Sequence, residues 1–213
     1  MESRNVALTL EKAREFYNSG NTALREVALQ AYTEEELTTP KFTDIMTFGD
    51  AVKALGLYNS DVQKDLEKFD NYKFEGNASK HLKAIYKLDI IRKALNGNWK
   101  PSFVKDIVYY PFVRFYPANK AKDVANSNRG KLGPSFIADG EKYTLVGGGS
   151  SYYSCGVGVG GFCMGVGHVN AYAGLLCCKS EEIAHHLSRY FMKEIFEAVC
   201  AQHIGMYEWV DKV

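Results

Sequence analysis

The sequence lacks the features that would place it in a specialised class of protein. It has no run of about 18 apolar residues, and its first residues, Met1 to Arg4, do not begin an apolar leader. The formal net charge is only +1, so the chain as a whole is not drawn to nucleic acid or to acidic membranes. Charged residues make up 24% and prolines number 5, which excludes disordered and collagen-like chains. We expect a folded protein with no signal peptide and no membrane partner.

Cysteine does not occur in the arrangements that define a disulfide or zinc framework. The chain has 5 Cys, an odd number, and no Cys-x-x-Cys pair. Cys177 and Cys178 are adjacent, so on a strand they would point to opposite faces rather than to one metal ion. No grouping of Ser, His and Asp suggests nucleophilic catalysis. We therefore predict reduced thiols, no metal, no cofactor and no enzymatic activity.

The near-zero net charge conceals a segregation of charge along the chain. Residues 1–77 carry 9 basic and 14 acidic side chains, residues 78–131 carry 12 and 3, and residues 132–213 carry 5 and 8. The middle region is also rich in aromatic residues, a combination found on nucleic-acid-binding surfaces. The alternative is structural: the aromatic residues would pack one face of a strand, and the lysines would form the solvated face of a helix. We favour the structural use and regard nucleic acid as an unlikely partner.

The first part of the chain is predicted to be helical. Apolar spacing predicts short helices over residues 10–17, 24–32 and 47–55, and a longer amphipathic helix over residues 78–95 that ends at Asn96-Gly97. Thr9 is the expected N-cap of the first helix, and Thr47 and Asp50 have the spacing of a capping box. Residues 57–77 are polar, and we expect a loop there.

The pattern changes after residue 97. Residues 107–116 are β-branched and aromatic, and Pro111 limits them to an interrupted or edge strand. Asp139-Gly140 predicts a tight hairpin, residues 173–178 a buried strand, and Ser180 the N-cap of a helix that continues to about residue 200. These patterns predict an α+β protein with a helical N-terminal region, 1–97, and a mixed domain, 98–213, that has a C-terminal helix.

Residues 147–174 form a segment unlike the rest of the chain, with 10 Gly, four Tyr or Phe and not one Lys, Arg, Asp or Glu. Gly147-Gly148-Gly149 follows a predicted strand as a phosphate-binding loop would, but the Lys-Ser/Thr pair and the helix that such loops need are missing. Two interpretations remain. The segment is either a recognition surface of Tyr, Ser, Gly and Asn, or a set of Gly-rich strands packed tightly against a neighbour.

If the segment is a recognition surface, its side chains supply the ligand contacts. Aromatic residues would provide contact area, and hydroxyl and amide groups would provide hydrogen bonds. The candidate ligand-binding residues are Ser151, Tyr152, Tyr153, Ser154, Phe162, Met164, His168, Asn170 and Tyr172.

One set of motifs is spread over most of the chain: Phe16-Tyr17-x-x-Gly20, Ala23-Leu24-x-x-Val27-Ala28-Leu29, Thr47-Phe48-x-x-Ala51, and Lys179-Ser180-Glu181-Glu182-Ile183-Ala184 leading to Tyr190-Phe191. In these motifs the chain resembles an uncharacterised protein family of gut anaerobes and their temperate phages. That family has no established activity. The resemblance implies a context, the cytoplasm or a phage virion, rather than a chemistry.

A second, narrower resemblance concerns the Gly-rich segment. Tyr143-x-Leu145-x-Gly147-Gly148-Gly149-Ser150, followed by an irregular stretch and Asn170-x-x-Ala173-Gly174-Leu175-Leu176, is similar to the variable region of proteins diversified by retroelements. Mutagenesis of adenines in AAC or AAT codons cannot produce Lys, Glu, Gln, Met or Trp, and Met164 is the sole residue of this group within 147–172.

This second resemblance implies a C-type-lectin-like domain that displays a diversified surface at 147–174. The function we predict is non-enzymatic binding of a protein or glycan, such as a receptor or a host surface molecule, and the formation of a homo-oligomer stays open. The alternative is a phage-associated nucleic-acid-binding protein that uses the basic region 78–131.

Overall fold

The computed structural model describes residues 8–38, 40–72, 76–97, 99–100, 107–150, 157–161, 176–200 and 204–210. Helices occupy most of the chain up to residue 96, and all described strands follow residue 106 and pair antiparallel, which confirms the predicted α+β class. The chain divides into two compact units, residues 1–40 and residues 41–213, each of which is described by itself.

The first unit is a small helical cluster. Its helices are α1 (Leu10–Asn18), α2 (Thr22–Ala31) and α3 (Glu34–Thr38). Thr9 caps α1 as predicted, because its side chain accepts a hydrogen bond from the backbone N–H of Lys12. Ala13, Ala28 and Leu37, one from each helix, form the buried centre. The first two helices were predicted, but the five-residue α3 was not.

The second unit begins with a helical layer of η1 (Phe42–Asp44), α4 (Phe48–Ala54), α5 (Asn59–Asn71) and α6 (Ala78–Asn96). The capping box of Thr47 and Asp50 is present, and α6 ends at Gly97, as predicted. The loop expected over residues 57–77 is wrong because α5 occupies most of it. Val62 and Leu66, four residues apart, are the buried side chains of α5, and such a narrow apolar stripe is masked by its polar surroundings.

Two further helices follow, α9 (Glu181–Tyr190) and α10 (Met192–Val199). Ser180 caps α9 as predicted, but the single helix expected to continue to about residue 200 is interrupted at Phe191, which has φ −121° and ψ 33°. Because the helix is divided, side chains of α10 pack into two separate hydrophobic clusters. Ile195 packs with α6 and α9, whereas Phe196 packs against the sheet.

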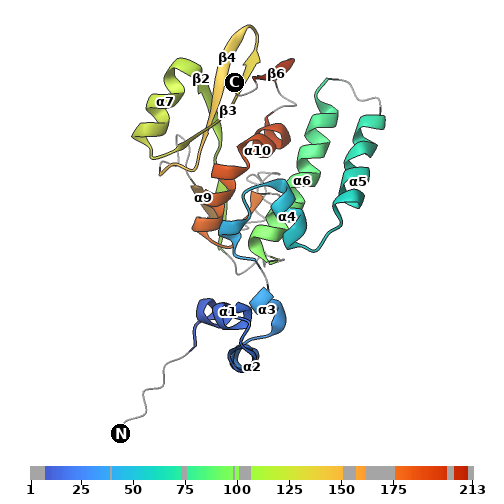
Figure 1. The fold of residues 1–213 in the computed structure, drawn as a ribbon. Coiled ribbons are helices and arrows are strands. Elements are labelled where there is room, and N and C mark those ends of the chain that lie inside the picture. The colour runs from blue at the N-terminus through green and yellow to red at the C-terminus, as the bar shows by residue number, and fades with distance from the viewer. Residues whose placement is uncertain are drawn as a thin grey trace. The chain divides into compact units, whose positions relative to one another are not determined.

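The main sheet has four antiparallel strands, β2 (Arg114–Pro117), β3 (Lys131–Ala138), β4 (Glu141–Gly147) and β6 (Tyr207–Val210), in the order β2-β4-β3-β6 (Figure 1). Helix α7 (Ala118–Ser127) joins β2 to β3 and covers one face, where Val146 is buried. Leu145, on the opposite face, packs against α10. Asp139 and Gly140 have φ values of 49° and 77° and form the tight hairpin predicted between β3 and β4.

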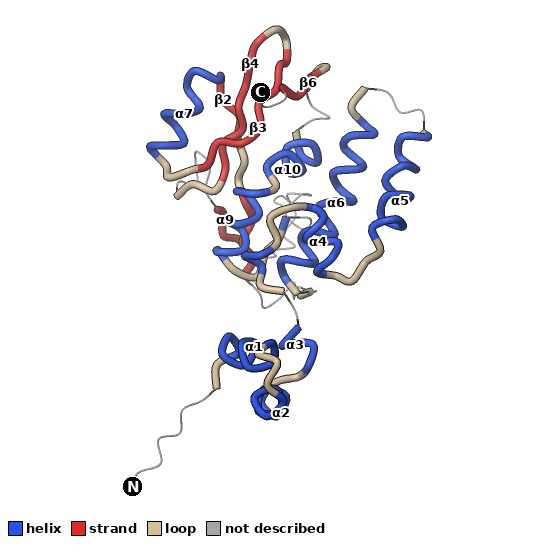
Figure 2. Tube along the Cα trace, in the orientation of Figure 1, coloured by secondary structure: helices blue, strands red, loops and turns tan. Residues whose placement is uncertain are grey.

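A second, two-stranded sheet pairs β1 (Ile107–Pro111) with β5 (Val157–Gly161) (Figure 2). The predicted strand over 107–116 is therefore interrupted, and its two halves, β1 and β2, belong to different sheets. Of the strand predicted over 173–178, the described residues contribute one bridge, in which Cys178 pairs with Tyr109 on β1.

The helices before residue 97 share a core with elements that follow it. Leu88 and Ile91 of α6 belong to the same buried cluster as Leu187 of α9 and Ile195 of α10. The structure thus groups α4 to α6 with the sheets in residues 41–213, whereas the sequence analysis drew its boundary after residue 97.

Candidate functional site

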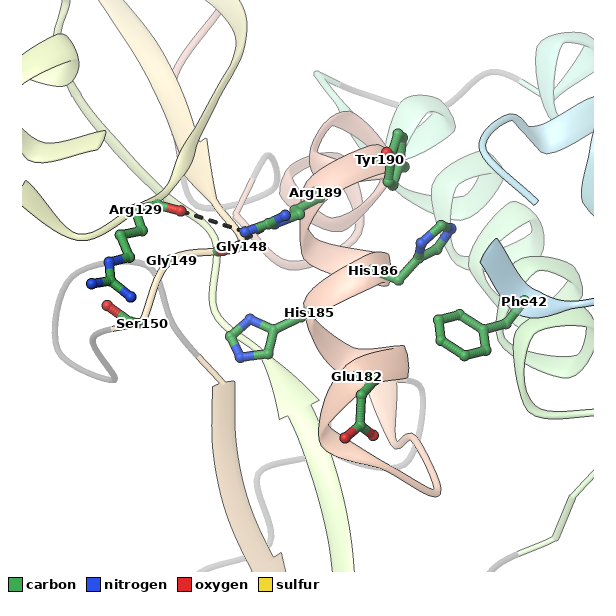
Figure 3. Close-up of a pocket in the computed structure, with 10 residues that line it drawn as sticks. All are labelled: Phe42, Arg129, Gly148, Gly149, Ser150, Glu182, His185, His186, Arg189 and Tyr190. Atoms are coloured by element: carbon green, nitrogen blue, oxygen red, sulfur yellow. Dashed lines mark hydrogen bonds between the residues drawn. The ribbon is translucent and has the colours of Figure 1, made fainter. Parts of the chain in front are cut away.

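A pocket of about 430 Å³ lies beside α9, at the point where the Gly-rich segment begins (Figure 3). Its volume falls within the range of small-molecule binding sites. The lining residues come from four stretches that are distant in sequence: Phe42; Arg129; Gly148, Gly149 and Ser150; and Glu182, His185, His186, Arg189 and Tyr190.

The glycines at the end of β4 are required by close packing against α9. A Cβ atom on Gly147 would overlap the carbonyl oxygen of Ser188, and one on Gly148 would overlap the side chain of Arg189. Gly148 also has φ +64°, a conformation that favours glycine. Gly147 and Gly148 are thus tightly packed, and Val157–Gly161 form the strand β5, which pairs with β1. In these parts of the Gly-rich segment the structure agrees with the interpretation of packed, Gly-rich strands.

The loop after β4 is fixed by hydrogen bonds to the end of α7. Ser150 donates its backbone N–H to the carbonyl oxygen of Asn128 at 2.7 Å, and its hydroxyl donates to the same oxygen at 3.1 Å. The N–H of Ser150 is therefore not directed at a ligand. A phosphate cradle made of successive backbone N–H groups, which the sequence analysis disfavoured, would need that group free.

Two arginines form one end of the pocket. Arg189 donates Nε–H to the carbonyl oxygen of Gly148 at 3.1 Å and Nη2–H to that of Arg129 at 3.5 Å. Arg129 has φ 52°, and its exposed guanidinium forms no ion pair with any residue that the structure describes. The one carboxylate among the described lining residues is Glu182.

A cluster of contacting rings forms the wall of the pocket on the other side from Arg129 (Figure 3). The buried His186 contacts Phe42 edge to face, with 5.4 Å between ring centroids, and Tyr190 at 4.5 Å. Lys131 Nζ lies 4.3 Å from the centroid of the Tyr190 ring, in cation–π geometry. The Nε2 atom of His186 is 2.8 Å from the carbonyl oxygen of Ile45, which accepts the hydrogen bond.

The two histidines of the pocket differ in their environments. Burial lowers the pKa of His186, and the positive charges of Lys131 and Arg189 lower it further, against the opposing effect of its hydrogen bond to Ile45. His186 is thus a neutral part of the wall at pH 7. His185 is partly exposed, and its Nε2 lies 3.5 Å from a carboxylate oxygen of Glu181.

Most of the basic residues on α6 are occupied by contacts within the fold. Lys83 pairs with Asp70, and Arg92 and Lys93 both pair with Asp89, at 3.1 and 2.6 Å. Two further lysines of α6 lie over aromatic rings, Lys80 over Tyr207 and Lys87 over Phe48. Three basic side chains on or just after α7, Lys120, Lys122 and Arg129, form no ion pair with a described residue.

All nine ligand-binding residues predicted from the sequence lie outside the described residues, so the structure does not test them: Ser151, Tyr152, Tyr153, Ser154, Phe162, Met164, His168, Asn170 and Tyr172. Sequence reasoning did not identify Arg129, His185, His186 and Arg189 as pocket residues. Arg129 and Arg189 are separated by 60 positions, and no local motif connects them.

The adjacent cysteines 177 and 178 are both buried. Burial raises the pKa of Cys178 to about 12, so its thiol is a poor nucleophile at neutral pH. Within the part of the chain that the structure describes, no three His, Cys, Asp or Glu side chains are grouped as metal ligands would be.

No family model, curated protein or solved structure matches the chain. Among the described helices, none combines the length and the apolar character needed to cross a membrane.

Proposed function

We propose that this protein binds a ligand without transforming it, and that its binding site extends from the pocket beside α9 into the segment 151–174. The observation that carries this proposal is the position of the pocket. Its wall includes Gly148–Ser150, the last described residues before the Tyr- and Ser-rich stretch. An aromatic wall and a cation with no ion-pair partner among the described residues are features typical of ligand-binding cavities.

The framing strands support a role in display for the Tyr- and Ser-rich residues. The nominated residues 151–154 lie between β4 and β5, and residues 162–172 lie between β5 and Cys178, which is bridged to Tyr109. Both groups thus connect paired elements. Substitutions outside β4 and β5 leave the described ladders of these strands unchanged in sequence, as diversification would require. We further propose that the domain displays them in the manner of the C-type-lectin-like proteins diversified by retroelements.

The proposal is tested by substituting display residues and measuring ligand choice. We expect Tyr152→Ser combined with Tyr153→Ser to change which proteins or glycans are captured on an array, with little change in melting temperature. Tyr58→Ser is the matched control, because Tyr58 is 77% exposed, directly precedes α5 and does not line the pocket. A large fall in the melting temperature of the double variant would show that the tyrosines are core residues and would overturn the proposal.

Diversification itself is tested by sequencing the gene in a natural population. Variation confined to codons 147–172, together with a near-copy of that stretch beside a reverse transcriptase, is the expected result. A uniform segment with no copy would contradict it.

A nucleic-acid-binding function is the second candidate, supported by the basic side chains around α7. Lys120, Lys122 and Arg129 have no carboxylate partner in the described part of the chain, whereas several basic residues of α6 are in ion pairs. If this surface binds nucleic acid, affinity falls as salt rises, and Lys122→Gln reduces the salt slope by about 1. The absence of binding at about 50 mM salt, where phosphate contacts are strong, would exclude this function.

A further inference from the structure

We infer that the pocket beside α9 takes the anionic group of a small organic ligand, a carboxylate or a phosphate, with the Arg129 guanidinium as its main contact. This inference rests on the proposed binding function and specifies its ligand.

The charges of the pocket are separated along α9. Glu182 and Arg189 are seven residues apart on the helix, which corresponds to about 10 Å at 1.5 Å per residue. Figure 3 shows Glu182 toward the start of the helix and Arg189 beside Arg129 and Gly148. Among the described lining residues, the one carboxylate, Glu182, therefore lies at the opposite end from the arginines. The arginine end is left with an excess of positive charge.

The two arginines have different roles at this end. Arg189 is held by the carbonyl oxygens of Gly148 and Arg129, so it ties the loop after β4 to the end of α7. Arg129 has its backbone fixed by that contact, while its guanidinium has no ion-pair partner among the described residues. A guanidinium presents a fork of N–H donors that fits the paired oxygens of a carboxylate or phosphate. Among the described residues, no carboxylate competes with an anionic ligand for the Arg129 guanidinium.

The aromatic wall indicates that the rest of the ligand is organic. The rings of His186 and Tyr190 are in contact, with 4.5 Å between their centroids, and Tyr190 is 40% exposed, so part of this residue is accessible to a ligand. Lys131, which is not a lining residue, lies over the same ring and adds its positive charge to those of the two arginines. An inorganic anion would use the guanidinium and leave this wall uncovered. A ligand that carries both a ring and an anionic group would match both features of the pocket lining.

The inference is tested by titrating the full-length, ¹⁵N-labelled protein with three ring compounds: phenyl phosphate, benzoate and the neutral benzyl alcohol. The readouts are the arginine Nε–H resonances of Arg129 and Arg189 and the backbone amides of Gly148–Ser150. We expect phenyl phosphate, benzoate or both to shift these signals, and the comparison of the two identifies the preferred anion. Benzyl alcohol should bind at least tenfold more weakly, since charge-assisted hydrogen bonds are worth about 1.5–3 kcal/mol.

Two variants separate the contact from a general charge effect. Arg129→Gln should weaken anion binding by about tenfold or more. Lys122→Gln removes the same charge from α7, at a residue that does not line the pocket, and should change the affinity less than about twofold because exposed charges are screened. Since both side chains are exposed, melting temperatures close to that of the unmodified protein would confirm that both variants are folded.

Three results would overturn the inference: equal binding of the anions by Arg129→Gln and the unmodified protein, equal binding of benzyl alcohol and the anions, or no shift with any probe at about 10 mM, well above a millimolar Kd. The proposed function fails separately. It falls if substitutions at Tyr152 and Tyr153 leave ligand choice unchanged, whereas the anion inference falls if ligand choice depends on those tyrosines but the probes do not bind at Arg129.

Discussion

Gly147→Ala is the sharpest test of how the pocket is built. Gly147 is the last residue of β4, and it lies against the end of α9. If its role is close packing rather than flexibility, a single added methyl group should destabilise residues 41–213. The substitution leaves the chemistry of the pocket lining unchanged, because Gly147 does not line it.

The magnitude follows from the atoms that a Cβ would meet. It would overlap the Ser188 carbonyl oxygen and lie 3.2 Å from the Ser188 carbonyl carbon and 3.3 Å from Met192 Cγ. The first two atoms are helix backbone and cannot rotate away, so the strand or the helix must move. Overpacking costs about 1–3 kcal/mol, and we expect the upper half of that range here. For a unit of this size, a loss of about 2–3 kcal/mol lowers the melting temperature by about 5–10 °C.

The assay is thermal unfolding followed by tryptophan fluorescence, because both tryptophans, Trp99 and Trp209, lie in residues 41–213. Gly49→Ala is the matched control. Its Cβ would have one neighbour, Thr47 Oγ1 at 3.7 Å, and Gly49 lies in α4, where alanine is favoured by up to about 1 kcal/mol. The control should therefore be neutral or stabilising. A melting temperature for Gly147→Ala within about 1 °C of the unmodified protein would refute the packing argument.

Three further predictions can be checked by urea unfolding. Thr47→Ala removes the capping box and should cost about 1 kcal/mol, and an unchanged midpoint would contradict the cap. The backbone N–H of Lys179 donates to Oδ1 of the buried Asn96 at 2.8 Å, so Asn96→Leu leaves this N–H without an acceptor. The free energy of unfolding should fall by about 1–3 kcal/mol or more. A neutral effect would show that another group accepts the hydrogen bond. The folded-state pKa of His186 is below its ordinary value of 6.5, so the unfolded chain binds the proton more readily. Stability is then complete above pH 6.5 and falls as the pH drops toward the folded pKa. His186→Gln should therefore reduce the loss of stability at acid pH, whereas His185→Gln should leave it unchanged. Equal profiles of stability against pH for the two variants would show that a group other than His186 causes the loss.

Elements whose ends are set by neighbouring residues could be predicted from the sequence. Thr9, the Thr47-Asp50 box and Ser180 each bond to a backbone group within three residues, so the motif contains the whole interaction. The Asp139-Gly140 hairpin is likewise encoded by the two residues that adopt positive φ.

Elements that depend on distant packing were missed. Helix α5 has two buried side chains, Val62 and Leu66, and the half-buried Phe69 contacts Tyr86 of α6, so its helical character depends largely on packing against α6. The interruption at Phe191 is equally invisible in the sequence, because the apolar spacing continues through it. The division becomes apparent when Ile195 and Phe196 are seen to enter different cores.

The pocket could not be predicted because its residues converge from four separate stretches. The sequence did identify Gly147-Gly148-Gly149 as unusual, and these glycines do adjoin the pocket. At the first two, the reason is the close approach of α9. The excess of basic residues before position 131 included Arg129, but nothing in the sequence distinguished it from its neighbours on α7.

Consecutive residues of α9 each have a packing or binding role, which limits the positions at which the sequence of this protein can vary. His186 and Tyr190 form the pocket wall, Leu187 enters the core, Ser188 meets Gly147, and Arg189 holds the loop after β4. A substitution at any of these positions would alter packing as well as binding, so we expect this end of the pocket to be constant. Under the proposed diversification, differences in ligand choice would come from residues 151–154 and 162–172, which flank β5 in the chain. An anionic group held at Arg129 would supply the part of recognition common to all variants, and the connecting segments would select the remainder of the ligand.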